Sequence, residues 1–191
     1  MKLNRNTIFL LIVALSLTGA VFFSEIRRDG FNLTTDNTQE TEISLIFPFQ
    51  IEAVKEIDLT IDGNGISFAK IGSNPHPWMM INPEKTKASD AAIAFLLNLF
   101  PRAQKKIELL ATDNLRQEYG INANSPTITI TLEGRDRYQI ILGKPNFDDT
   151  QIYAEVIFPE KDDIPPHIYL ISKSFQYALE RDFDEWKNNE Q

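Results

Sequence analysis

The chain has 191 residues, of which 42% are hydrophobic and 24% are charged, and its formal net charge is −8. Such a composition excludes general disorder and suits one soluble domain or two small, closely packed ones. The acidic balance, without a cluster of Lys and Arg, argues against a nucleic-acid partner, and the absence of cysteine excludes disulfides, thiolate catalysis and zinc-thiolate sites.

Residues 7–23 form an uncharged, almost wholly apolar run that follows Lys2 and Arg5. As a helix the run would extend roughly 25 Å, slightly less than the ~30 Å hydrocarbon core of a bilayer, so flanking residues must help it to span. We predict a single transmembrane anchor within residues 1–26, with the amino terminus inside. A cleaved signal peptide is the alternative, because Thr18 and Ala20 are small enough to precede a cleavage site.

The segments after the anchor differ sharply in composition. Residues 27–42 are polar and rich in Thr, Asn and Glu, which is typical of a flexible tether. Residues 43–186 carry the predicted exported domain, and residues 187–191 form a polar tail. With the amino terminus inside, the domain lies on the periplasmic, extracytoplasmic or thylakoid lumenal side of its membrane.

The first part of the domain reads as a hairpin, a strand and a helix. Alternating apolar residues at 57–61 and 66–68 flank the turn sequence Asp62-Gly63-Asn64-Gly65. Residues 77–83 supply a third strand between prolines. Ser89 is the expected N-cap of a helix whose apolar spacing runs to Phe100, where Pro101 ends or bends it.

The stretch from Asn114 to Gly134 raises the question of a binding or catalytic loop. It follows a predicted strand at 105–111, and Asp113 is the expected cap of a short helix that runs through Tyr119 and ends at Gly120. Ser125 before Pro126 favours extended backbone leading into a strand at 127–133. Each position has a conformational role, so we interpret the stretch as structural.

Residues 57–72 and 128–143 resemble each other as hairpins, with an acidic residue and Gly at the turn, a closing Gly, and a second turn one residue longer. A Trp- or Tyr-containing strand and a helix follow each hairpin. The last helix is expected over 174–183, with Phe175, Leu179 and Phe183 on one face. The pattern predicts an α+β fold, a mainly antiparallel sheet packed by a few helices, with a duplicated hairpin-strand-helix unit as a hypothesis.

The sequence contains few residues that could carry chemistry. His76 and His167 are the two histidines, both beside prolines, and we interpret each as a loop residue. Arg181 suits the carboxyl end of the last helix, and Trp78 reads as a core or edge anchor rather than a ligand-stacking ring. No sequence motif of a nucleotide-binding loop, a zinc protease or a serine hydrolase occurs.

Two pairs of adjacent carboxylates, Asp148 with Asp149 and Asp162 with Asp163, have the chemistry to hold a divalent cation. Solvated turn residues are the more common explanation of such pairs in polar loops. We therefore assign no catalytic, cofactor or metal residue and expect no enzyme. The alternative is a surface-tethered enzyme or ligand- or metal-binding domain that uses these aspartates or His167, which requires their loops to converge.

In the order of these features the chain resembles a bacterial family of membrane-anchored domains of unknown function, number 4340 among such families. The resemblance rests on the apolar anchor, "VKEIDLTIDGNGISFAK" followed by "PWMMINP", "DNLRQEYGINANSPTITITLEG" followed by "YQIILGK", "QIYAEV" and the final "ALERDF". It covers residues 43–186. The chain departs from the usual pattern of the family at two places, the longer link before Ser125 and the presence of Pro101 in the first long helix.

The resemblance implies exported domains, some associated with ABC-type transport and gliding motility, and carries over no catalytic residue. Together with the anchor, it leads us to expect a non-enzymatic accessory or assembly protein that binds a larger membrane complex. A transporter accessory subunit is one form of this function. An assembly factor, including one for a photosynthetic complex, is another.

Overall fold

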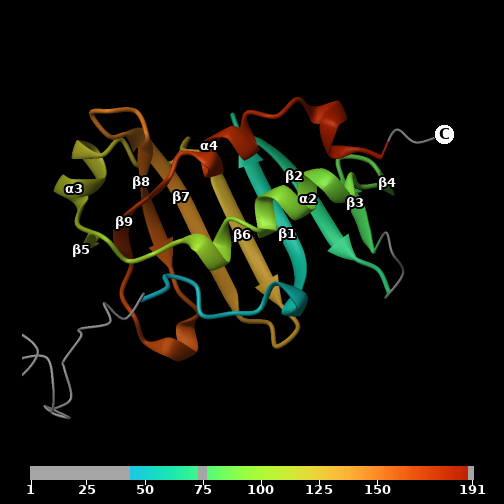
Figure 1. Cartoon of the computed structure of the whole chain (residues 1–191), viewed down its shortest axis with the longest axis horizontal. Helices are drawn as coiled ribbons and strands as arrows, with labels where there is room; N and C mark the ends of the chain where they lie inside the picture. The colour runs from blue at the N-terminus through green and yellow to red at the C-terminus, as the bar shows by residue number, and fades with distance from the viewer. Residues whose placement is uncertain (1–43, 73–76, 189–191) are drawn as a thin grey trace, which may run out of the picture. The chain divides into compact units, whose positions relative to one another are not determined.

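One antiparallel sheet of nine strands dominates the computed structural model, which describes residues 44–72 and 77–188 (Figure 1). The predicted anchor, the tether and His76 lie outside the described residues. The strand order across the sheet is β4-β3-β2-β1-β6-β7-β8-β9-β5. The strands are β1 (Val54–Ile61), β2 (Asn64–Lys70), β3 (Trp78–Asn82), β4 (Thr86–Lys87), β5 (Glu108–Leu110), β6 (Thr127–Leu132), β7 (Arg137–Pro145), β8 (Gln151–Ile157) and β9 (His167–Ser172).

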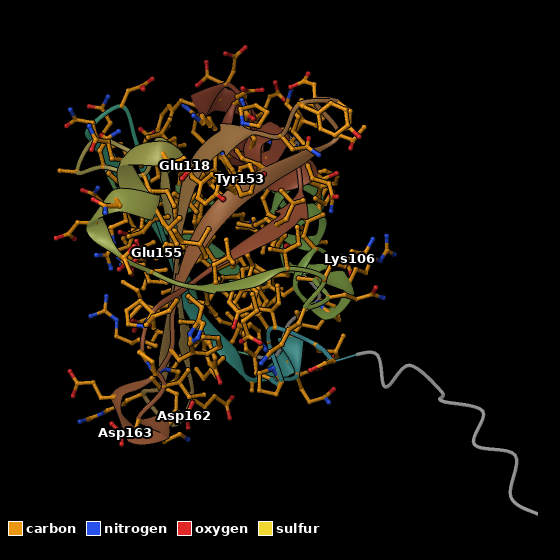
Figure 2. All side chains as sticks on the ribbon, turned by 90° about the vertical axis from the view of Figure 1, so that its left-hand side faces the viewer. Lys106, Glu118, Tyr153, Glu155, Asp162 and Asp163 are labelled. Atoms are coloured by element: carbon orange, nitrogen blue, oxygen red, sulfur yellow. The ribbon has the colours of Figure 1, made fainter. Side chains whose placement is uncertain are left out.

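Helical segments connect the strands and cover parts of the sheet. Figure 2 shows α3 on the opposite side of the sheet from the segment that contains α2. The α-helices are α2 (Asp90–Leu97), α3 (Asp113–Glu118) and α4 (Ser174–Leu179), and the short 3₁₀ turns are η1 (Ile51–Ala53), η2 (Phe100–Arg102), η3 (Glu160–Asp162) and η4 (Phe183–Trp186). The predicted α+β fold with a mainly antiparallel sheet is confirmed.

The main core lies between the sheet and the layer formed by α2, α4 and η4. Period-2 alternation places Ile57 and Leu59 of β1 on the covered face, opposite Phe68 and Ile66 of β2. The two helices contribute Ile93, Leu96, Phe175 and Leu179 from above, and Trp186 of η4 is fully buried against Phe68, with ring centroids 5.3 Å apart. Burial of each large apolar side chain contributes about 1.5–3 kcal/mol.

The two hairpins take the central places in the sheet. β1 and β6 pair at its middle, and β2 with β3 then lie outward on one side as β7 with β8 do on the other. The first turn is only Asp62 and Gly63, both with positive φ, whereas residues 133–136 connect β6 to β7. The pairing register confirms the predicted difference of one residue, because Ile57 pairs with Phe68, eleven positions further on, whereas Ile128 pairs with Ile140, twelve positions further on. Asp136 already faces Leu132, whose N–H donates to the Asp136 carbonyl at 2.9 Å.

The helix boundaries differ from the prediction at three points. Ser89 caps α2 as expected, accepting a hydrogen bond from the Ala92 N–H, but α2 ends at Leu97. Thr112, not Asp113, is the N-cap of α3 and accepts from Leu115 N–H. α4 ends at Leu179, so Phe183 begins η4 instead of continuing the helix.

The carboxyl end remains part of the packed unit beyond residue 186. Lys187 pairs with Ala88 in an isolated antiparallel bridge, and the Asn188 N–H donates to the Lys87 carbonyl at 2.9 Å. The start of the predicted polar tail is therefore hydrogen-bonded to the edge of the sheet.

Candidate functional site

The two aspartate pairs lie at opposite ends of β8. Asp148 and Asp149 precede the strand and Asp162 and Asp163 follow it, so its seven residues, which extend about 23 Å, separate them. Figure 1 shows the β7–β8 connection at the upper end of these strands and η3 at the lower end, where Figure 2 places Asp162 and Asp163. The loops do not converge, and no group of three or more potential metal ligands occurs among the described residues.

The aspartates instead hold their own turns. Asp148 Oδ1 accepts hydrogen bonds from the Thr150 hydroxyl at 2.6 Å and the Thr150 N–H at 3.1 Å, and these bonds lower the pKa of Asp148. Asp149 has φ +59° and accepts from Lys173 Nζ at 2.5 Å. Asp163 takes a left-handed conformation with φ +50° at the end of η3. This is the turn role that the sequence favours.

The other residues considered from the sequence also have structural surroundings. Trp78 is 7% exposed and belongs to the main core, as the anchor interpretation expects. His167 Nδ1 lies 2.7 Å from the Pro165 carbonyl at the start of β9. Arg181 follows α4, donates to Glu185 at 3.0 Å and lies over the Trp186 ring, so it secures η4 rather than only the helix end.

α3 is fixed to the second face of the sheet by an ion pair to a buried carboxylate and by a ring stack. Arg116 donates through Nε and Nη2 to the Glu155 carboxylate at 2.8 and 2.7 Å, which raises the pKa of Arg116, and Glu155 is 2% exposed. Tyr119 stacks on Tyr153 with ring centroids 4.0 Å apart. Figure 2 shows Tyr153 and Glu155 next to α3, which carries the labelled Glu118. Within the stretch from Asn114 to Gly134, Arg116 and Tyr119 thus have a structural role, because they fix α3 to the sheet.

The most unusual surface residue is Phe147, whose side chain is 100% exposed in the β7–β8 loop. The loop is held firmly: Asn146 Oδ1 accepts from the N–H groups of Thr150 and Gln151 at 3.1 and 3.0 Å, and the Asp149 N–H donates to the Asn146 carbonyl. A braced loop therefore presents a large apolar ring to water.

A second aromatic ring lies beside the same loop. Lys173 bonds Asp149 of the loop and also lies 5.5 Å from the ring centre of Tyr177, which is half exposed on α4. We call Phe147, Tyr177 and Lys173 the aromatic tip. Sequence reasoning missed it, although a Phe inside the polar turn Asn146-Phe147-Asp148 was a visible signal.

A cleft of about 590 Å³ adjoins the aromatic tip, where η2 and the segment before β5 meet the ends of β8, β9 and α4. Two cations and several hydrogen-bonding side chains line it, and none of its lining residues is acidic. We call it the basic cleft; its polar lining includes Arg102, Gln104, Lys106, Gln151, Ser172 and Ser174. No local pattern in the sequence indicates it, because these residues come from positions up to 72 apart.

No helix among the described residues is long and apolar enough to cross a membrane. The apolar run at residues 7–23 is outside those residues. No family model, curated protein or solved structure matches the chain.

Proposed function

We propose that the chain is a single-pass membrane protein whose non-enzymatic exported domain binds a larger membrane complex through the aromatic tip. The apolar run at residues 7–23 supports the anchor. The observation that carries the docking role is Phe147, a fully exposed ring on a loop fixed by hydrogen bonds.

An ordered exposed aromatic ring suits recognition of a protein. Aromatic residues dominate binding hot spots, because a rigid ring buries a large apolar area with little loss of side-chain freedom. The turn around Phe147 is already formed, so a partner need not order it, which reduces the entropy cost of association. The neighbouring Asp148 is an exposed carboxylate, and its negative charge favours a partner pocket with a cationic rim.

The strand order supports a further part of the proposal, a duplicated unit. β1-β2-β3-β4 followed by α2 corresponds to β6-β7-β8-β9 followed by α4, and the two sets extend outward from the β1–β6 pair. The second unit carries the fully exposed ring of Phe147 in the loop between its second and third strands. In this proposal the two duplicated units form the sheet and its helices, and the Phe147 loop is a feature by which the second unit differs from the first.

The test is affinity purification from gently solubilised membranes through a carboxyl-terminal tag, comparing the wild type with Phe147→Ser. Ile164→Ser is the matched control, because Ile164 is 43% exposed in the connection at the other end of β8. We expect the wild type and the control to recover one defined complex in near-stoichiometric amount and Phe147→Ser to lose most of it.

Each part of the proposal has its own contrary result. Equal recovery with Phe147→Ser would refute the aromatic tip as the docking site. Mass spectrometry of the mature amino terminus tests the anchor, since a soluble protein cleaved after Ala20 would refute it. The copurified partner distinguishes a transporter accessory subunit from an assembly factor.

A further inference from the structure

The basic cleft contains two cations that no described carboxylate neutralises. Arg102 and Lys106 are exposed and form no ion pair with a described residue. The acidic side chains nearby are already engaged, because Glu108 accepts from Lys105 and Tyr169, and Asp149 accepts from Lys173. In a chain of net charge −8, this is a local excess of positive charge. Figure 2 shows Lys106 on the side of the sheet away from Glu155.

Uncharged donors surround the same space. The side-chain amides of Gln104 and Gln151 form no hydrogen bond with a described residue, so their N–H groups are available. Ser172 Oγ accepts from the Ser174 N–H at 3.2 Å, which leaves the Ser172 hydroxyl proton free to donate. Thr150 also lines the cleft, but its hydroxyl already donates to Asp148 and is therefore not free to donate to a ligand.

This set of donors matches a tetrahedral oxyanion. An Arg guanidinium can bind two oxygens of a phosphate at once, and a Lys ammonium supplies a compact charge beside it. A carboxylate has only two oxygens, whereas three terminal oxygens of a phosphate monoester can use the cations and the neutral donors together. Two cations suit one phosphate group and are too few to bind along a nucleic acid.

We propose that the basic cleft is a binding site for a single phosphate group, held by Arg102 and Lys106 with help from Gln104, Gln151 and Ser172. Its volume of about 590 Å³ is within the ~300–1,000 Å³ typical of small-molecule sites and leaves room for the group that the phosphate esterifies. A soluble phosphate ester and the phosphate of a lipid headgroup share this chemistry. The site goes beyond the docking role and does not depend on it.

The first experiment titrates inorganic phosphate into the full-length protein in uncharged detergent at constant ionic strength, followed by amide NMR shifts. We expect saturable shifts centred on Gln104, Gln151 and Ser172. The double variant Arg102→Gln with Lys106→Gln should weaken binding by about tenfold or more, since it removes both charge-assisted contacts. The matched control, Lys55→Gln with Arg137→Gln, makes the same charge change on exposed residues away from the cleft and should bind within about twofold of the wild type.

A second arm identifies the source of the phosphate. The protein is placed in nanodiscs of phosphatidylcholine alone or with phosphatidic acid added, without free phosphate. Cleft shifts that appear only with phosphatidic acid, and are lost in the Arg102→Gln, Lys106→Gln variant, assign a lipid headgroup. Shifts produced only by free phosphate assign a soluble ligand.

Three results would overturn the site: shifts that rise linearly over the whole surface, equal affinity in the double variant and the wild type, or no response in either arm. Unchanged melting of both double variants shows that the fold is retained, and the single variant Lys106→Gln replaces the double one if it does not fold. Phe147→Ser should bind phosphate as the wild type does, so failure of the docking proposal and failure of this one are separate outcomes.

Discussion

Gly143 allows β7 and the turn after α3 to approach each other closely, and replacing it with alanine should destabilise the domain severely. An ideal Cβ at this position would lie 2.3 Å from the Tyr119 carbonyl oxygen and 2.9 Å from Ile121 Cγ1. β-carbons essentially never lie closer than 3.0 Å to such a neighbouring atom. The 2.3 Å contact with the Tyr119 oxygen must therefore lengthen by at least 0.7 Å, which requires the backbone to shift. The Lys144 N–H donates a hydrogen bond to the same Tyr119 oxygen at 2.8 Å, and the shift would break this bond.

The expected cost follows from these two effects. Overpacking costs about 1–3 kcal/mol and loss of the backbone hydrogen bond about 1 kcal/mol, so Gly143→Ala should lower the free energy of unfolding by about 2–4 kcal/mol. Urea unfolding of the full chain, followed by tryptophan fluorescence, measures it, and Tm should fall by about 5–15 °C.

A matched substitution makes the test specific. At Gly134 an added Cβ would meet only Asp136 Oδ2, at 3.8 Å, so Gly134→Ala should stay within about 0.5 kcal/mol of the wild type. If Gly143→Ala were as stable as Gly134→Ala, the close approach of β7 to the turn after α3 would be refuted.

Three further substitutions test the packing of the domain. Arg116→Leu should lower the free energy of unfolding in urea by about 3 kcal/mol, because it leaves the Glu155 carboxylate buried without its partner. Adding Glu155→Leu should restore much of this stability. A double variant that recovers none of it would refute the explanation. Tyr169→Phe removes the hydrogen bond that lowers the pKa of Glu108. Glu108 therefore contributes stability that is present above the ordinary pKa of a glutamate and is lost as the pH falls through its lower pKa in the folded protein. Tyr169→Phe should thus lower the free energy of unfolding by about 1 kcal/mol at neutral pH and by less in acid. A loss of stability that does not change with pH between these two pKa values would contradict the prediction. Thr112→Ala should cost about 1 kcal/mol through loss of the N-cap of α3, and an unchanged unfolding midpoint would show that the cap does not contribute.

The sequence by itself determined the features that depend on a few neighbouring residues. Asp62-Gly63 makes a tight hairpin turn because both residues adopt positive φ, and Ser89 starts α2 because its hydroxyl reaches the Ala92 N–H. Gly120 ends α3 with φ +71° for the same local reason. Alternating apolar residues likewise indicated β1, β2 and β6 and the α+β class of the fold.

Only the tertiary structure decided which distant residues meet. α4 stops at Leu179 although Phe183 keeps the helical spacing, and the chain then turns through η4, which places Trp186 in the core beside Phe68. The basic cleft joins residues of η2 to the ends of β8 and α4, and the ion pair between α3 and Glu155 joins residues 39 positions apart. Capping hydrogen bonds and tight turns involve only a few neighbouring residues and leave a signal in the sequence, whereas the packing of one face against another sums contacts over the whole sheet. The fold class was therefore readable from local pattern, and a Phe in a polar turn was a local signal for the aromatic tip, whereas the basic cleft became visible only once the strands were placed side by side.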